Sequence, residues 1–164
     1  MIIFIKNKHT LQIDDFKFQC CIGKKGSTLN KTEGDKKTPK GTFEIENLYF
    51  RKDRKNCPDT LLKCIEIKKD MGWCNDVRFP KKYNKIFKIK KGIRYEKLKR
   101  HDYKYDLLIP IKYNFKNPLI GRGSCIFIHL TKNYKPTAGC IALKEKDFLI
   151  MLKIIKKNSK IKIF

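Results

Sequence analysis

Short runs of apolar residues that alternate with polar ones are the feature that most constrains the fold of this chain. The alternation has a period of two, which is typical of β-strands with one buried face. Gly, Pro, Asn and Asp interrupt it every few residues, so the strands must be short. The predicted strands are residues 2–5, 11–18, 42–50, 61–67, 86–89 and 107–113.

Three segments near the C-terminus complete the predicted elements. Residues 125–129 form a continuous apolar run that ends in His129, as a strand buried on both faces would. Residues 144–157 are the one segment with helical spacing, and residues 160–164 alternate again as a last strand. The apolar face of the helix consists of Phe148, Met151, Leu152 and Ile155.

These elements predict a single, mainly β domain over residues 1–164, a sandwich or barrel with one packed helix near the C-terminus. No repeat or low-complexity linker divides the chain. Residues 68–85 and 90–106 are rich in charge, and we expect them to be long surface loops.

The net charge raises the question of a polyanionic partner. The chain has 40 basic and 16 acidic residues among 164, a formal charge of +24, and basic surfaces attract polyanions. However, 34 of the basic residues are Lys, only 6 are Arg, and they are spread along the chain. Nucleic-acid readers depend on Arg, so no nucleic-acid partner is expected. A non-enzymatic basic domain that binds a polyanion remains the alternative from another class.

The apolar runs are too short for membrane or export segments. None approaches the roughly 20 residues of a membrane-spanning helix, so no integral membrane segment is expected. The apolar run at residues 1–5 is also shorter than that of a signal peptide.

Seven cysteines invite a disulfide or metal interpretation. They lie at positions 20, 21, 57, 64, 74, 125 and 140, without any Cys-x-x-Cys. The three histidines have no zinc-ligand spacing with them, so no metal site is predicted. Most of these cysteines are expected to be small buried residues.

One pair, His129 and Cys140, has the residue types of an acyl-transfer site. A thiol is a strong nucleophile only as the thiolate, and a neighbouring imidazole can take its proton. A strand that ends in His129 and a loop that returns Cys140 would bring the two together. Gly139 allows backbone to approach a substrate carbonyl closely. The spacing alone leaves open that Cys140 is a core cysteine and His129 an ordinary strand-end residue.

The residues around this pair carry a resemblance. Residues 121–143, GRGSCIFIHLTKNYKPTAGCIAL, resemble the active-site segment of the L,D-transpeptidase catalytic-domain family. Residues 34–43, GDKKTPKGTF, contain a Thr-Pro-x-Gly-x-Phe turn like that in the N-terminal half of the family. Residues 71–76, with Tyr83 and Asn84 after them, are similar to a shorter-chain bacterial branch. The resemblance runs in the family's order from about residue 20 to the C-terminus.

The resemblance implies acyl transfer on peptidoglycan stem peptides in the cell envelope or periplasm. Cys140 would attack the carbonyl before a D-residue, releasing D-alanine and forming a thioester that an amine acceptor resolves into a cross-link. His129 would accept and return the proton, and Gly139, with the backbone of Thr137 and Ala138, would shape the oxyanion site. The implied enzyme is a monomer, needs no cofactor or metal, and is acylated by carbapenems. A hydrolase that resolves the same thioester with water remains open.

The motif departs from the family's commonest form, Ser/Thr-His-Gly-Cys with an Arg two positions later. Here it is Thr-Ala-Gly-Cys, with Ala142 where the Arg would stand, and the interval from His129 to Cys140 is shorter than usual. The missing Arg removes a bidentate clamp for a carboxylate. Arg122 is the hypothesised replacement, and a solvated turn residue is the alternative reading of it.

Overall fold

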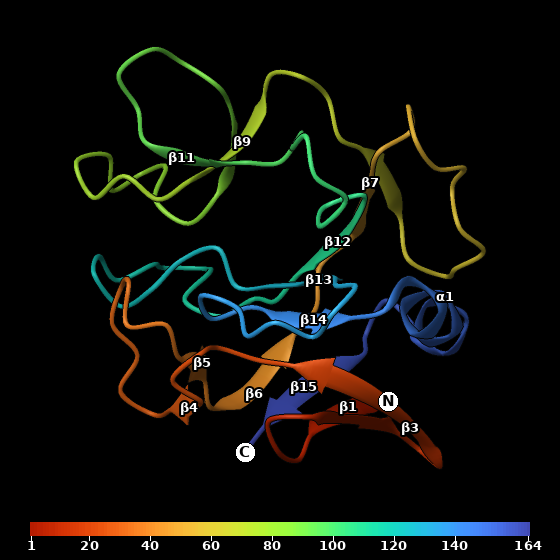
Figure 1. The fold of residues 1–164 in the computed structure, drawn as a ribbon. Helices are drawn as coiled ribbons and strands as arrows, with labels where there is room; N and C mark the ends of the chain where they lie inside the picture. The colour runs from red at the N-terminus through yellow and green to blue at the C-terminus, as the bar shows by residue number, and fades with distance from the viewer.

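The computed structural model describes residues 1–164 and contains fifteen short strands and one helix (Figure 1). The strands are β1 (Ile2–Ile5), β2 (Thr10–Ile13), β3 (Phe16–Cys21), β4 (Ser27–Thr28), β5 (Thr38–Pro39), β6 (Gly41–Glu44), β7 (Leu48–Phe50), β8 (Cys64–Glu66), β9 (Met71–Cys74), β10 (Ile86–Lys88), β11 (Tyr95–Lys97), β12 (Leu107–Pro110), β13 (Phe127–Leu130), β14 (Ile141–Leu143) and β15 (Lys160–Ile163). The helix is α1 (Glu145–Ile154). The mainly β prediction with one helix is confirmed.

Ten strands form one curled sheet in the order β6-β15-β1-β2-β3-β14-β13-β12-β7-β8. A β-bridge between Ile45 and Ile111 joins the segments that follow β6 and β12. Two backbone hydrogen bonds flank this bridge, from Glu46 to Pro110 at 2.9 Å and from Lys112 to Glu44 at 2.8 Å. The sheet therefore closes between β6 and β12, as a barrel does.

The central strands are buried on both faces, which explains their continuous apolar sequence. Ile128, Leu130, Ile141 and Leu143, from β13 and β14, belong to the main core of 25 buried residues. Phe127, from β13, faces a second core of eight residues, which lies toward the three-stranded sheet β10-β9-β11. The alternation of side chains thus turns one face of β13 toward the main core and the other, with Phe127 and His129, toward the second core.

Helix α1 covers the main core with the residues that its spacing predicted. Phe148, Met151, Leu152 and Ile155 are all fully buried. The helix is shorter than expected, because the backbone of Ile155 is already extended, with ψ 151°.

Two of the segments that were each predicted as one strand contain two strands in the structure. Residues 11–18 form a hairpin of β2 and β3, in which Ile13 pairs with Phe16. The turn between them uses Asp14 at φ 49°, a conformation that Asp adopts more readily than most residues. Residues 42–50 divide into β6 and β7, which lie at different places in the sheet. In both cases the alternation of apolar and polar residues continues through the turn, so the sequence pattern does not show where one strand ends and the next begins.

The predicted surface loops at residues 68–85 and 90–106 are wrong in part, because they contain β9 and β11. β9 is the central strand of the three-stranded sheet, and its Trp73 pairs with Ile86 of β10 on one side and with Glu96 of β11 on the other. The high charge of both segments led to the loop prediction, and β9 also contains Gly72. A Cβ at Gly72 would lie 2.8 Å from the ring of Tyr95, so the glycine allows close packing within a strand.

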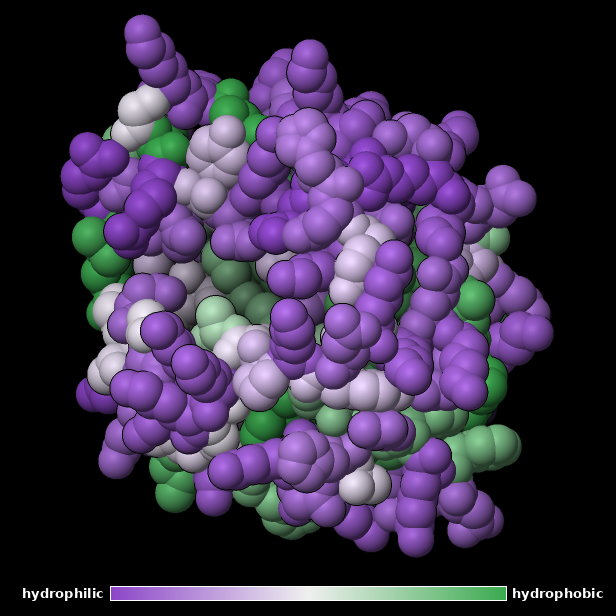
Figure 2. All heavy atoms as spheres, in the orientation of Figure 1, coloured by the Kyte–Doolittle hydropathy of each residue, from purple (hydrophilic) through white to green (hydrophobic).

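The face shown in Figure 2 is mostly hydrophilic, with a hollow between the three-stranded sheet and the large sheet where apolar atoms are visible at depth. No helix here has the length and apolar character needed to span a bilayer.

Candidate active site

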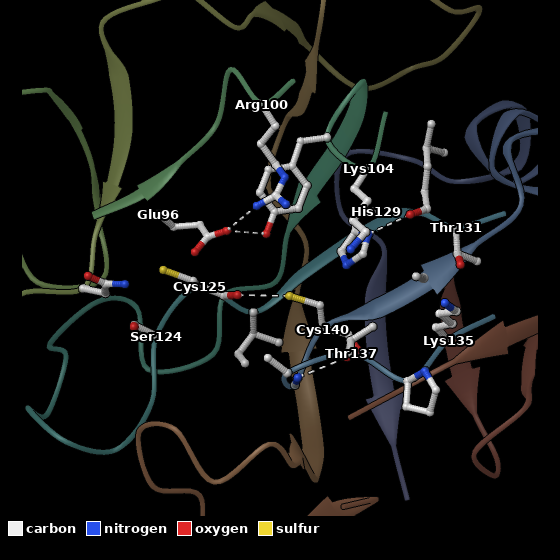
Figure 3. Close-up of a pocket in the computed structure, with 18 of the residues that line it drawn as sticks. Glu96, Arg100, Lys104, Ser124, Cys125, His129, Thr131, Lys135, Thr137 and Cys140 are labelled. Carbon is white, nitrogen blue, oxygen red and sulfur yellow. Dashed lines mark hydrogen bonds and ion pairs between the residues drawn. The ribbon is translucent and has the colours of Figure 1, made fainter. Parts of the chain in front are cut away.

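His129 lies on β13, Cys140 immediately precedes the neighbouring parallel strand β14, and both line one cavity of about 400 Å³ (Figure 3). The register of β13 and β14 pairs His129 with Ala142, two residues beyond Cys140. The large sheet forms one wall of the cavity, and the segment of residues 96–105 forms another. The pair predicted from the sequence is therefore brought to one site by the ladder itself.

The Cys140 thiol is buried and protonated in this arrangement. Its Sγ donates a hydrogen bond to the backbone oxygen of Cys125 at 3.2 Å, and no hydrogen bond joins it to His129. Burial raises the pKa of Cys140 to about 12, against a smaller lowering by the backbone N–H of Phe127. At neutral pH Cys140 is therefore a thiol, which would have to lose its proton in order to act as a nucleophile.

The His129 imidazole is neutral and its orientation is fixed. Nδ1 lies 2.9 Å from the carbonyl oxygen of Leu130, which assigns the proton to Nδ1 and leaves the lone pair on Nε2. The ring of Tyr105 packs edge-on against it, with centroids 5.4 Å apart. Burial lowers the pKa of His129 to about 4, so the ring can accept a proton at neutral pH.

The turn before Cys140 holds the backbone in a conformation suited to glycine. Gly139 has φ 145°, and a Cβ there would lie 2.9 Å from the backbone oxygen of Lys37. Thr137 fixes the turn: its Oγ1 accepts from the Gly139 N–H at 3.1 Å and donates to the Cys140 carbonyl at 2.5 Å. The backbone N–H of Thr137 also has a partner, because it donates to the carbonyl oxygen of Ile22.

Two amide groups of this turn remain available to a substrate. Neither Ala138 nor Cys140 donates its backbone N–H to a protein acceptor. Ala138 is exposed and both residues line the cavity. Thr137 and Gly139 therefore shape the predicted oxyanion site, and the N–H groups of Ala138 and Cys140 are the donors that it can offer.

Thr38 is a positioning residue that the sequence analysis did not single out. It is fully buried in the Thr-Pro turn, and its Oγ1 accepts from the Gly23 N–H and donates to the Gly139 carbonyl, both at 2.9 Å. The Thr-Pro motif was visible in the sequence. Its partner lies 101 residues away, so only the fold could show that this turn supports the residue before Cys140.

Arg100, rather than Arg122, is the arginine that lines the cavity. Its guanidinium already forms ion pairs with Asp102 at 2.7 Å and with Glu96 at 3.3 Å, and it lies over the Tyr105 ring. Arg122 is exposed on its turn, where its backbone oxygen accepts from Tyr113 at 2.6 Å. Lys104 and Lys135 also line the cavity, and neither makes an ion pair. The proposed substrate role of Arg122 stays a prediction.

No group of three or more His, Cys, Asp or Glu side chains is arranged to hold a metal ion. The chemistry that this site can perform with its own residues is nucleophilic attack by Cys140, with His129 as the proton acceptor.

Comparison with known proteins agrees with this geometry. The family model of the YkuD L,D-transpeptidase catalytic domain matches residues 1–163. The chain belongs to this family. No curated protein matches it.

Among solved structures, the fold of this chain is similar to the fold of Bd1075 from Bdellovibrio bacteriovorus. The TM-score is 0.50 at 15% identity, over 99% of this chain and 47% of the other. At this identity the likeness concerns the fold alone, and the chain spans less than half of that protein's length. The resemblance seen in residues 121–143 is thus confirmed at the level of the family.

Proposed function

We propose that this L,D-transpeptidase family member is a cysteine acyltransferase that acts on peptidoglycan stem peptides in the cell envelope. The observation that carries the proposal is that His129, on β13, and Cys140, just before the paired strand β14, line one cavity, with the N–H groups of Ala138 and Cys140 unused beside them. The family supplies the substrate class, and these residues supply the chemistry.

The proposed reaction has two stages. In the first, the Cys140 sulfur attacks the stem-peptide carbonyl while its proton moves to Nε2 of His129, and the amides of Ala138 and Cys140 hold the oxyanion. The C–N bond then breaks, the proton passes from His129 to the leaving D-alanine nitrogen, and a thioester remains. In the second, an acceptor amine attacks the thioester, its proton passes through His129 to sulfur, and the C–S bond breaks.

Because both partners are neutral at rest, the proton transfer accompanies the attack. Burial keeps the pKa of Cys140 high and that of His129 low, so an ion pair of thiolate and imidazolium is disfavoured before substrate binds. Attack by water at the second stage would give a hydrolase with the same first stage. The acceptor specificity of the second stage therefore decides between the two activities.

The test is intact-protein mass spectrometry after incubation with a carbapenem. One adduct is expected on the wild type and none on Cys140→Ala. Cys57→Ala is the matched control, because Cys57 is an exposed free thiol that does not line the cavity, and this variant should keep the adduct. Absence of an adduct on folded wild type would contradict the proposal and favour the basic polyanion-binding domain. Muropeptide assays would then separate transfer from hydrolysis.

A further inference from the structure

The buried side chain of Asn84 forms four hydrogen bonds, although it does not line the catalytic cavity. Its Oδ1 accepts from the indole N–H of Trp73 at 2.9 Å and from the backbone N–H of Cys125 at 3.1 Å. Its Nδ2 donates to the carbonyl oxygens of Tyr113 at 3.0 Å and Asn114 at 2.7 Å. Since an indole can only donate and a carbonyl can only accept, these partners fix which end of the amide is the oxygen. All the donors and acceptors of this amide are therefore used.

The backbone of Asn84 is fixed at the end of β9. Its N–H donates to the Cys74 carbonyl at 2.8 Å, and the N–H of Cys74 donates to the Lys85 carbonyl at 2.9 Å. Its φ is 54°, a conformation that Asn adopts more readily than most residues. Trp73, which precedes Cys74, is buried in the second core and packs against Phe127 with ring centroids 5.2 Å apart. The side chain of Asn84 therefore extends from a well-packed support.

Cys125 is the partner of Asn84 that contacts the proposed nucleophile. Its carbonyl oxygen accepts the hydrogen bond from Cys140 Sγ at 3.2 Å (Figure 3). Cys125 has φ 56°, in the left-handed region, where a residue with a Cβ is strained. Such a conformation persists only where the surrounding structure holds it. Figure 3 shows the side chain of Cys125 pointing away from Cys140, so the backbone of Cys125, and not its thiol, makes the contact.

The contact from Cys125 fixes the position of the Cys140 sulfur. A thiol has one proton, and a bond from it to a fixed carbonyl selects one staggered position of Sγ about the Cα–Cβ bond. The proton must leave this bond when the sulfur attacks, so the bond acts before the chemical step by holding the sulfur in place. Misplacement of a reacting atom by about 1 Å can slow a reaction about a hundredfold.

We infer that Asn84 is a positioning residue for the nucleophile and acts through the backbone of Cys125. This inference rests on the proposed function, because it concerns the nucleophile of the same site. The Cys125 N–H donates to no protein acceptor except Asn84 Oδ1. This bond holds the left-handed backbone of Cys125, and the carbonyl of the same residue holds the Cys140 sulfur.

The test compares the rate of carbapenem adduct formation in wild type and Asn84→Gly, because glycine accepts a φ of 54° and only the side chain is lost. The maximal rate should fall about tenfold, since the sulfur is no longer held in place. The carbapenem concentration that gives half the maximal rate should stay within about twofold of wild type, because Asn84 lies outside the cavity.

Asn114→Gly is the matched control. Asn114 also has a positive φ, of 49°, and its side chain bonds to the backbone of Leu119 and Gly123 in the same loop, but not to Cys125. This control should lose stability and keep the wild-type rate.

A second substitution, at Cys125, tests the route through the backbone. Glycine adopts the left-handed region without strain, whereas alanine is strained there as cysteine is. Added to Asn84→Gly, Cys125→Gly should therefore recover about threefold of the lost rate. Cys125→Ala, which removes the same thiol, should recover none. If Asn84→Gly does not fold, Asn84→Ser, which loses the same amide and keeps a hydroxyl, takes its place in the same comparisons.

The outcomes separate the two proposals. If wild type forms no adduct, the proposed function fails and this inference fails with it. If wild type forms the adduct and the Asn84 variant keeps its maximal rate, only this inference is refuted. An equal loss of rate in Asn114→Gly, or equal rates in the two double variants, would also refute it, because the cause would be a general disturbance of the loop. Far-ultraviolet circular dichroism checks that each variant is folded.

Discussion

Replacing Thr38 with Val tests how the Thr-Pro turn supports catalysis. The hydroxyl of Thr38 joins two backbone groups that are distant in sequence, the Gly23 N–H and the Gly139 carbonyl, each at 2.9 Å. Val keeps the β-branched shape and cannot make either bond. Because Thr38 is fully buried, water cannot easily replace the hydroxyl.

The magnitude follows from these two bonds. Leaving a buried donor or acceptor unpaired costs about 1–3 kcal/mol, so Thr38→Val should lower the free energy of unfolding by about 2–6 kcal/mol. The loss also releases Gly139, which precedes the nucleophile and lies beside the unused amides. A displacement of this turn by about 1 Å should slow acylation of Cys140 by roughly ten- to a hundredfold.

Urea unfolding gives the stability, and the rate of carbapenem adduct formation gives the activity, both measured where each variant is fully folded. Thr60→Val is the matched control: Thr60 Oγ1 also accepts from one backbone N–H, of Leu62, and donates to one carbonyl, of Leu152. Because that pair of bonds ties a surface loop to α1, the control should lose stability and keep its acylation rate. Equal rates in wild type and Thr38→Val would refute the positioning role.

Three further predictions concern the same cavity. As pH falls from 6.5 toward about 4, the free energy of unfolding should decrease by roughly 3 kcal/mol through His129, because the unfolded chain binds the proton at a higher pH than the native state does. Urea unfolding at several pH values measures this decrease, which should be absent in His129→Gln. Gly139→Ala should fold less stably and acylate slowly, since its Cβ would lie 2.9 Å from a backbone oxygen at φ 145°; adduct rates check this, and a wild-type rate would contradict it. Lys104→Ala and Lys135→Ala should each raise the KM for a donor with a free carboxylate a few-fold, and unchanged affinity in Arg122→Ala would refute the role predicted for that residue.

The sequence allowed the site to be predicted where the chemistry is local to a strand. A strand that ends in His129 and a loop that returns Cys140 suggested the pair, and the resemblance to the family selected it. In the structure, the parallel ladder of β13 and β14 brings the two residues to one cavity. The helix was equally readable, because Phe148, Met151 and Leu152 repeat with its period. Both predictions depend on residues that are close together in the sequence.

What the sequence could not reveal depends on contacts between distant segments. The hydroxyl of Thr38 donates a hydrogen bond to the Gly139 carbonyl, and the hydroxyl of Tyr83 donates one to Glu33, which is 50 residues away in the sequence. Two strands of the three-stranded sheet, β9 and β11, were missed for a related reason: β9 contains Gly72, and each has only three or four residues, too few to show a period. The third strand, β10, was predicted as residues 86–89. Such elements are stabilised by tertiary packing, here of Trp73 in the second core, rather than by local preference.

The departures from the family motif bear on how the nucleophile is activated. Ala142, which replaces the motif's Arg, is fully buried in register with His129, so β14 places no cation beside Cys140. Burial outweighs the groups that lower the pKa of the Cys140 thiol, which is about 12, so in the proposed reaction Cys140 would depend on His129 to remove its proton during attack. In a Cys57→Ala background, His129→Ala should therefore react with a carbapenem at a rate that rises about tenfold per pH unit, without a plateau up to about pH 10. A plateau near the ordinary cysteine pKa would show that the thiolate forms without His129 and would refute this account of the site.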